Sequence, residues 1–431
     1  YHTGRRNTSR YSMKQQSNFT LLDLKIGIST YDDELDQSGM FVVPFNANQL
    51  LELHYIEDIT KSNVLLMLKM NDTATGILAN LQGMEPMDIS WQDQDENVMT
   101  FSMVIYDVKD RMIIDGKKSQ ATLYCISVDA VKNSATKISR RFGKGGGEST
   151  HKMVTQLMTQ DIGTDKVIDA DESETKLSFI SPYWDPYTII AWLAWRSIYQ
   201  GGSGEHGAGY LFYEDFRGYH FKAMDKMVEQ ETVREINVNF KPDDEETNDA
   251  INIGAITVTG NSDIFRGLNL GSYASATYTL DMKDFKYTEI PFFINDFYPK
   301  MKKLNPLSEL PEFYKRFGDA QTGGKPTRIM SKVLDTSMYT EGKYTQDLTK
   351  QLSHSMIRNQ MFFNQSATFD YEGPMDLMIG TVVNVNKYNP RSGELDREES
   401  GRYIVGKIYR QFLTERDTMS TRVTLYRDSI G

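Results

Sequence analysis

Segments in which apolar and polar residues alternate stand at both ends of the chain, and this alternation is the strongest constraint on its fold. The last such segment divides its side chains between two faces, with Met419, Thr421, Val423 and Leu425 on one and Ser420, Arg422, Thr424 and Tyr426 on the other. Successive side chains of a β-strand point to opposite faces, so the pattern predicts a strand with one buried side.

The strand-like segments form two groups. The first lies between residues 19 and 140 and reads LLDLKIGIS, QLLELHYIED, VLLMLKM, TFSMVIYDV and ATLYCISVDAV. The second, in the later half of the chain, reads INIGAITVTG, SYASATYTLDM, MIGTVVNVNKY, RYIVGKIYRQFLT and MSTRVTLYRD. Short strands in series, separated by polar or Gly-containing turns, are typical of sandwiches and barrels.

The region between the two groups has helical features. Ser149 and Thr150 can cap a helix that extends through Ile162, and Asp185 followed by Pro186 is a typical helix start. The sequence YLFYEDFRGYHFKAM then predicts a hairpin that turns at Arg217 and Gly218. We therefore expect two helices packed on a hairpin.

The stretch Phe179 to Gly202 holds three of the four tryptophans. Its apolar residues cover most of a helix circumference, which predicts a helix enclosed by other elements. The alternative is an aromatic ligand site, but such a site needs convergent polar groups that this stretch lacks. A packed core that includes Trp192 is the favoured interpretation.

Charge disfavours a role in reading nucleic acid. Forty-eight Lys and Arg stand against 59 Asp and Glu, giving a net charge of -11, which repels phosphate. The first 18 residues are the exception, because they are basic and contain no acid. We expect them to be a polar arm whose true start lies upstream, since the sequence does not begin with Met.

No motif for catalysis or metal binding is complete. GKGGGEST and TGGKPT lack the spacing of a phosphate loop, and the six histidines lack zinc spacing. The stretch Asp169 to Ile180 begins like a calcium loop but has Glu174 and Ile180 where a glycine and a carboxylate are needed. Carboxylate pairs such as Asp32/Asp33 and Asp95/Glu96 are better explained as solvated faces. The sequence predicts no catalytic, cofactor-binding or metal-binding residues, no cofactor and no enzyme activity.

No apolar run approaches the roughly 18 residues that cross a bilayer, so no membrane insertion is expected. The single cysteine, Cys125, lies in an alternating segment and is expected to be a small core residue.

Taken in order, the segments resemble those of the baseplate central hub proteins of contractile-tailed bacteriophages. The similarity extends from QLLELHYIEDITKSNVLLMLKM through VIYDVKDR and ATLYCISVDAVKNSATKISRRFGKG. It continues through PYWDPYTIIAWLAWRSI, GYLFYEDFRGYHFKAMDKM and DIFRGLNLGSYASATYTLDMKDFKY to YIVGKIYRQF and TRVTLYRDS. No single segment is specific, whereas their order and spacing are.

The resemblance implies an α+β fold with two tube-type antiparallel β-barrel domains and peripheral α/β domains. We expect the following divisions: a basic arm at 1–18, a first barrel at 19–142, an α/β domain at 143–235, a second barrel from 236–293 and 356–431, and a Pro/Gly-rich insertion at 294–355.

The resemblance also implies a structural protein of the virion, located in the tail baseplate and assembled in the host bacterial cytoplasm. Three chains would form a homotrimeric ring around the DNA channel, with the central spike protein, tail tube or tube-initiator proteins and other baseplate subunits as partners. No sequence-specific nucleic-acid binding is expected. A channel must not hold the moving DNA, so its lining is predicted to be acidic and neutral polar, with Arg5, Arg6 and Arg10 outside it and available to acidic faces of neighbouring subunits.

Two other functions remain open from the sequence. A tail-associated cell-wall hydrolase would need a carboxylate pair or a metal in a cleft. A carbohydrate-binding tail protein would need exposed aromatic side chains, for which Trp91 and Trp184 are the candidates.

Overall fold

The computed structural model describes residues 19–29, 40–73, 76–93, 95–114, 118–143, 146–201, 209–239, 250–260, 264–306, 308–310, 312–317, 325–338, 348–363, 365–373, 375–389, 391–414 and 418–429. The N-terminal arm and the Asp32/Asp33 pair therefore lie outside the described residues.

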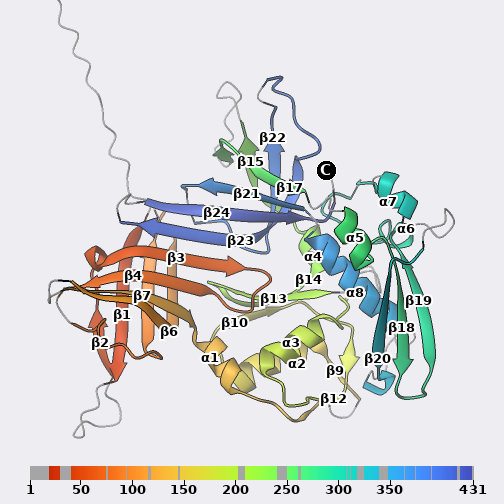
Figure 1. Cartoon of the computed structure of the whole chain (residues 1–431), viewed down its shortest axis with the longest axis horizontal. Coiled ribbons are helices and arrows are strands. Elements are labelled where there is room, and N and C mark those ends of the chain that lie inside the picture. The colour runs from red at the N-terminus through yellow and green to blue at the C-terminus, as the bar shows by residue number, and fades with distance from the viewer. Residues whose placement is uncertain are drawn as a thin grey trace, which may run out of the picture.

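Fourteen of the described strands form one continuous sheet, whose main path runs β16-β15-β22-β23-β3-β4-β7-β6-β5-β1-β2. A branch of β24, β21 and β17 leaves it at β23 (Figure 1). The strands of the first group are β1 (Thr20–Ser29), β2 (Met40–Pro44), β3 (Leu50–Asp58), β4 (Leu65–Asp72), β5 (Pro86–Gln92), β6 (Val98–Ile114) and β7 (Lys118–Ser127). Those of the second are β15 (Thr232–Val238), β16 (Ile251–Ile253), β17 (Thr257–Gly260), β21 (Gln365–Tyr371), β22 (Val382–Lys387), β23 (Gly401–Leu413) and β24 (Thr418–Arg427).

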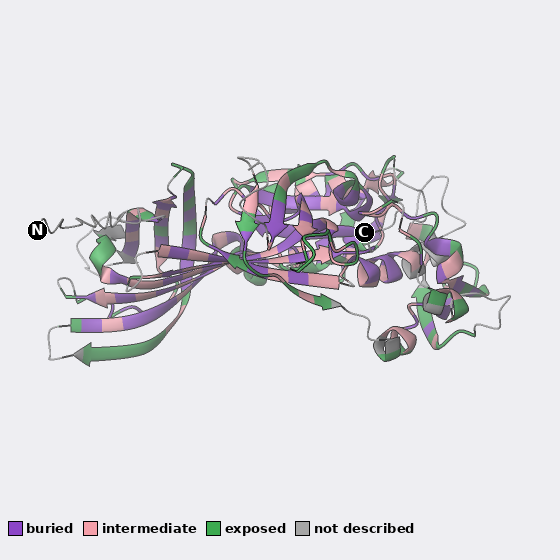
Figure 2. Cartoon of the chain, turned by 90° about the horizontal axis from the view of Figure 1, so that it is seen from above, coloured by how far each residue is buried: buried purple, intermediate pink, exposed green. Residues whose placement is uncertain are grey.

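Each strand group packs its own core. Trp91, Tyr55 and Phe101 form the aromatic centre of the first core, with ring centroids 4.8 to 5.7 Å apart. The second core is mostly Val, Ile and Leu from β21 to β24. Burial alternates along the strands, as the sequence pattern predicts, and Figure 2 shows the resulting bands. In β24 the residues predicted to point inward are buried and their neighbours are not, which confirms the two faces.

Strand β23 belongs to both cores. Its first residues pair with β22 and its later ones, Lys407 to Leu413, pair antiparallel with β3, while β24 follows the opposite edge. The two strand groups, far apart in sequence, are thus joined edge to edge by backbone hydrogen bonds of the β3–β23 ladder.

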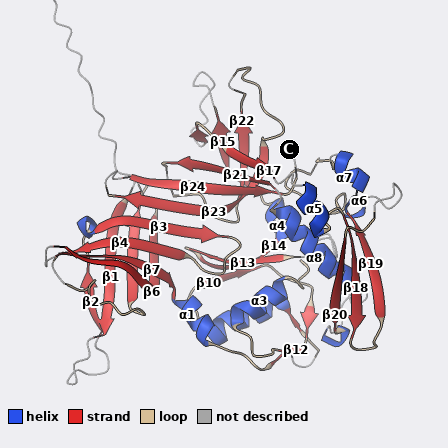
Figure 3. Ribbon diagram, in the orientation of Figure 1, coloured by secondary structure: helices blue, strands red, loops and turns tan. Residues whose placement is uncertain are grey.

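The middle of the chain packs helices on a small sheet (Figure 3). Its helices are α1 (Val128–Ala135), α2 (Thr150–Gln156), a π-helical turn (Leu157–Ile162), α3 (Pro186–Ala194) and α4 (Met224–Glu229). Its strands are β8 (Arg141–Phe142), β9 (Glu148–Ser149), β10 (Val167–Ala170), β11 (Lys176–Leu177), β12 (Phe179–Ile180), β13 (Tyr210–Asp215) and β14 (Gly218–Ala223). The predicted hairpin is confirmed as β13–β14, and Asp185 caps α3 by accepting a hydrogen bond from Thr188 N at 2.9 Å.

Two local predictions for this region are wrong. The strand expected to run through Val131 ends at Ser127, and α1 begins at Val128. The tryptophan helix is not enclosed on all sides: Leu193 is buried, but Ala191 is exposed and Trp195 is 39% exposed. Trp192 is half-buried, packed on the Phe179 ring at 4.7 Å. The elements packed on α3, among them α2 and β13, cover only part of its circumference, and composition alone cannot reveal that limit.

A separate three-stranded sheet has the order β19-β18-β20. This part of the chain contains α5 (Ile264–Leu270), β18 (Ala274–Asp281), β19 (Tyr287–Phe293), α6 (Ile294–Phe297), α7 (Glu312–Phe317), β20 (Arg328–Leu334) and α8 (Leu348–Phe362). The stretch expected to be a loose insertion contributes β20, which pairs parallel with β18. The domain boundaries themselves remain a prediction.

The α+β class is confirmed, whereas the two antiparallel barrels are not, because no sheet of the described residues closes on itself. In the second group β15 also pairs in parallel with β16 and β22, against the expected antiparallel pairing. The second core comes near to closure: three residues separate β16 and β17, the two end strands of its sheet.

Gly406 lies in β23 between the residues that pair with β22 and those that pair with β3. It lies at the bulge between Val405 and Lys407, where its carbonyl accepts a hydrogen bond from Ile59 N at 2.9 Å. A Cβ at this position would lie 2.0 Å from Cδ2 of the Tyr426 ring. Gly406→Ala is therefore expected to cost about 1–3 kcal/mol or more, because the ring must move out of a packed site.

The measurement is the urea midpoint of unfolding. Gly254→Ala is the matched control, since a Cβ at that position meets no atom within 4 Å. Equal midpoints for the two variants would contradict the proposed steric role of Gly406.

Candidate functional site

The most extensive candidate site is one face of the continuous sheet where it crosses both cores. We call it the outer sheet face; it consists of the side chains of β7, β4, β3, β23, β24 and β21 that point away from the cores. Strand register places in adjacent rows Thr122, Tyr124, Met67, Lys69, Glu52, His54, Ile56, Lys407, Tyr409, Gln411, Ser420, Arg422, Thr424, Thr368 and Asp370.

Two ion pairs bind four of the charged side chains on the outer sheet face. Lys69 donates to Glu52 at 2.9 Å, and Arg422 binds Asp370 through two nitrogens at 2.7 and 2.9 Å. Lys407 lies opposite Asp58 in the ladder. The hydrogen bond from Arg422 lowers the pKa of Asp370, and the one from Lys69 lowers that of Glu52, so both carboxyls are ionised at neutral pH. The face is polar and close to electrically neutral.

Beneath this face lies a buried ion pair that joins the two strand groups. Glu57 of β3 and Arg410 of β23 are 1% and 0% exposed, and Glu57 Oε2 lies 3.8 Å from Arg410 Nη1. Glu57 also accepts hydrogen bonds from Tyr55 Oη at 2.5 Å and Phe216 N at 3.0 Å. Burial raises the pKa of Glu57, and the charge of Arg410 opposes that rise.

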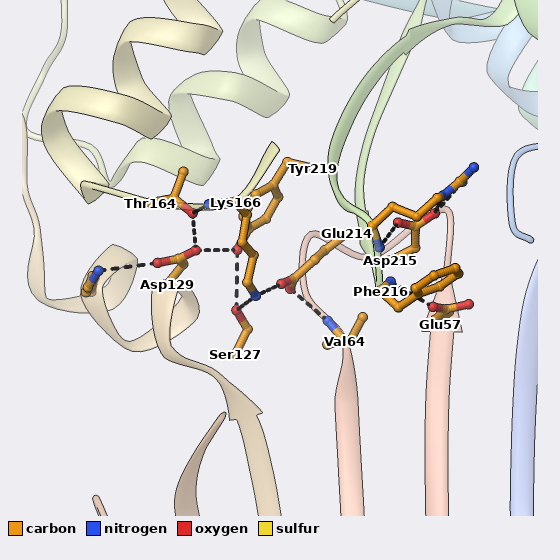
Figure 4. Close-up of polar contacts among 12 residues, drawn as sticks. Glu57, Val64, Ser127, Asp129, Thr164, Lys166, Glu214, Asp215, Phe216 and Tyr219 are labelled. Carbon is orange, nitrogen blue, oxygen red and sulfur yellow. Dashed lines mark hydrogen bonds and ion pairs between the residues drawn. The ribbon is translucent and has the colours of Figure 1, made fainter. Parts of the chain in front are cut away.

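The tip of the β13–β14 hairpin places its own charges beside Glu57 (Figure 4). Glu214 accepts from Val64 N at 3.1 Å and forms an ion pair with Lys166. Asp215 is held by His220 at 2.9 Å and by Arg217. Burial alone would raise the pKa of Asp215, but the hydrogen bonds from His220 and Arg217 lower it below its usual value.

The network continues into the helical layer. Lys166 donates to Ser127 at 3.0 Å, at the end of β7. Asp129 of α1 accepts from Thr164 at 2.6 Å and from Tyr219 at 3.2 Å (Figure 4). These contacts connect β3, β4, β7, α1 and the hairpin. We call the residues joined by these contacts the charged junction: Glu57, Arg410, Lys166, Glu214, Asp215, Arg217, His220, Ser127 and Asp129. Their contacts hold the sheet, α1 and the hairpin together.

The tryptophans singled out for carbohydrate binding are not exposed platforms. Trp91 is 0% exposed at the centre of the first core and donates from Nε1 to Met375 Sδ at 3.3 Å. Trp184 is half-buried, with its ring 6.2 Å from that of Trp192.

The candidate carboxylates have structural partners or face solvent. Asp169 and Asp171, from the calcium-like stretch, bind lysines: Asp169 pairs with Lys222 at 2.6 Å and Asp171 with Lys226 at 2.7 Å. Asp95 and Glu96 are exposed in the turn between β5 and β6. Among the residues that the structure describes, no group of three or more His, Cys, Asp and Glu could hold a metal ion.

The remaining predictions concern single features. Cys125 is a buried core residue, as predicted, and burial raises the pKa of its thiol. Within the described part of the chain, every helix is too short or too polar to span a bilayer.

Sequence reasoning missed the charged junction, although a signal was present. Arg410 has the same parity as Ile408 and Phe412 in β23, and Glu57 that of Tyr55 in β3. A charged residue at an inward position of a strand requires a buried partner. The alternation pattern identifies Arg410 and Glu57 as inward-pointing charges, but it does not show that they form an ion pair with each other.

Comparisons with solved structures find the same fold. A tail protein from Neisseria meningitidis MC58 matches with a TM-score of 0.56 and 9% identity, covering 96% of this chain and 98% of that one. The 43 kDa tail protein of prophage MuSo2 from Shewanella oneidensis matches with a TM-score of 0.52 and 10% identity, covering 96% of this chain and 100% of that one.

The chain has the fold of a phage tail protein. The resemblance to phage tail proteins drawn from the sequence is thereby confirmed at the level of the fold. No protein-family model and no curated protein matches the sequence.

The buried pair leads to a mutational prediction. Arg410→Met removes the cation from a fully buried carboxylate, and breaking such a pair typically costs about 3–5 kcal/mol. Because Glu57 can become neutral by taking a proton, the loss should shrink as pH falls toward the ordinary Glu pKa of about 4.3. A carboxyl whose pKa is higher in the folded than in the unfolded state lowers the free energy of unfolding more as pH rises. The loss of stability in Arg410→Met should therefore be larger at neutral than at mildly acidic pH.

Urea midpoints at neutral and mildly acidic pH measure the effect. Arg422→Met is the control, because it breaks an exposed pair with Asp370 and should cost only about 0–1 kcal/mol. A loss for Arg410→Met no larger than the control, or one that does not change with pH, would contradict the role given to the pair.

Proposed function

We propose that the chain is a structural subunit of a phage tail baseplate, where three copies form a hub ring that connects the tail tube to the central spike and encloses the DNA channel. One observation carries the proposal: a single sheet crosses two cores and presents one polar, charge-paired face, in a chain with a phage tail fold. Two sheet-bearing units per chain would give six in a ring of three.

The outer sheet face suits a channel wall. Lys and Arg contacts to phosphate are what hold DNA to a protein, and each one adds affinity that a moving strand must break. On this face Glu52 and Asp370 neutralise Lys69 and Arg422. The face is balanced rather than acidic, which departs from the predicted channel lining: carboxylates bind Lys69 and Arg422, and Lys407 lies opposite Asp58 in the ladder.

The ring is tested by mass. Multi-angle light scattering at micromolar concentration should give a particle of three times the chain mass of 49.4 kDa, and with a candidate spike protein the mass of the bound spike should be added to it. A monomeric mass under both conditions would contradict the proposal.

The wall is tested by charge reversal. The unmodified protein should bind double-stranded DNA negligibly at physiological salt. The double variant Glu52→Lys, Asp370→Lys adds two cations and releases Lys69 and Arg422 from their partners. The double variant should bind DNA more tightly than the unmodified protein. This added affinity should decrease steeply with salt, with a slope of log K against log salt concentration of roughly −0.9 per phosphate contact.

Fluorescence anisotropy with a labelled duplex measures this change. The control is Asp284→Lys, Glu312→Lys, which makes the same change in net charge at exposed positions of the β18–β20 region. Equal binding by the two double variants would show that total charge, rather than the outer sheet face, controls the contact with DNA.

A further inference from the structure

A polar cavity lies between the β10–β14–β13 sheet and the segment 379–381 of the second core. It measures about 210 Å³, and residues of α4 also line it. Strand register builds one of its walls: Asp169 of β10, His220 of β14 and Tyr213 of β13 lie in one row across the three strands, and all three side chains belong to the lining. The cavity is therefore held by paired strands and not by a loop.

Tyr213 brings to this cavity a hydroxyl that the fold does not use. The residue is 2% exposed and its ring stacks on that of His220 at 4.9 Å, but its oxygen makes no hydrogen bond to any residue that the structure describes. The oxygen lies against Gly380, another lining residue, where a Cβ would collide with it. It is within reach of a small ligand, because it is not among the buried polar atoms that the surrounding protein seals off.

An unpartnered hydroxyl in a buried position is costly, so the Tyr213 oxygen indicates a ligand that forms the missing hydrogen bond. Burial raises the pKa of Tyr213, which therefore keeps its proton at neutral pH and can donate it. The ligand group that meets this hydroxyl is accordingly a hydrogen-bond acceptor.

The cations around the cavity also have donors to spare. Lys226 is half-exposed and binds one oxygen, Oδ1 of Asp171 at 2.7 Å, although an ammonium carries three N–H donors. Arg217 binds Asp215 through Nε and Nη2, and within the described residues its Nη1 has no acceptor. The acceptors are occupied, since Asp171 already takes part in three hydrogen bonds. Unused donors without unused acceptors favour a ligand with anionic oxygens.

The opposite part of the lining is apolar. Met227, Ile379 and the ring of Tyr213 form it. A phosphate ion carries oxygens on every side and would turn some of them against these side chains, which costs free energy. A carboxylate on a short aliphatic stem would place its oxygens at the donors and its methylene groups at the apolar part.

We propose that this cavity binds a carboxylate on a short aliphatic stem, to whose oxygens the Tyr213 hydroxyl and the Lys226 ammonium donate. Such a group occurs in a free dicarboxylic acid and in an acidic side chain of a partner protein. The site does not depend on the proposed hub ring, because all its residues belong to one chain.

Ligand-observed NMR with the full chain tests the class of ligand. The probes are glutarate, glutamate capped as its N-acetyl methylamide, and inorganic phosphate. A carboxylate probe should bind with a dissociation constant on the order of 1 mM, as expected for a ligand of this size. Tighter binding of glutarate identifies a free acid as the ligand, and tighter binding of the capped glutamate identifies a side chain. If neither carboxylate binds well above this concentration, or phosphate binds as tightly, the proposal is overturned.

Tyr213→Phe separates binding from folding. Because the hydroxyl has no partner in the fold, the variant should keep or raise the urea midpoint, while its affinity for the carboxylate probe falls about tenfold, as for the loss of one hydrogen bond to a charged group. Lys226→Gln should weaken binding by a similar factor. Unchanged affinity in Tyr213→Phe contradicts the site.

Tyr210→Phe is the matched control. Tyr210 is also buried in β13, but its hydroxyl donates to the Glu172 carbonyl at 2.9 Å. This variant should lower the urea midpoint and leave the affinity for the probe unchanged. Equal losses of affinity in the two tyrosine variants would show a general effect on the hairpin and refute the role of Tyr213. Because particle mass is measured separately, failure here leaves the hub ring standing, and the reverse also holds.

Discussion

The pairing of β3 with β23 is the contact on which the rest of the structure depends. It pairs two strands that lie more than 300 residues apart in sequence and makes two cores share one sheet. A shift of one residue in β23 would turn Arg410 outward and Tyr409 inward, because side chains alternate along a strand. The buried partners of Arg410 therefore fix the register, and the register fixes which side chains form the outer sheet face.

The charged junction contributes to the uniqueness of this arrangement more than to its net stability. Replacing a buried ion pair by apolar residues of similar size is often neutral or stabilising, whereas removing one partner is costly. Glu57 accepts from Phe216 N, and Glu214 from Val64 N, only when the β13–β14 hairpin sits at one place against the first core, whereas Asp215 finds its donors within the hairpin itself. Any other placement leaves buried charges without partners, and this selects one orientation of the helical layer.

The same physics gives the two faces of the sheet opposite properties. The inner face buries Glu57 and Arg410 as an ion pair, while on the outer face Glu52 pairs with Lys69 and Asp370 with Arg422, in partly exposed positions of the ladder. A surface whose cations are already occupied offers little to a polyanion. One strand register therefore gives both the buried ion pair of the inner face and the near-neutral charge of the outer face.

The sequence by itself predicted the two strand groups, the capped helix, the hairpin and the two faces of β24, because each depends on residues close together in the chain. It also marked Arg410 as a charge at an inward position. Only the tertiary structure decided that Arg410 meets Glu57, that β20 joins β18, and that Trp195 faces solvent. Which strands become neighbours, and how much of a helix they cover, depend on the packing of segments far apart in sequence. The periodicity of apolar residues indicates which side chains are buried, but not which element buries them.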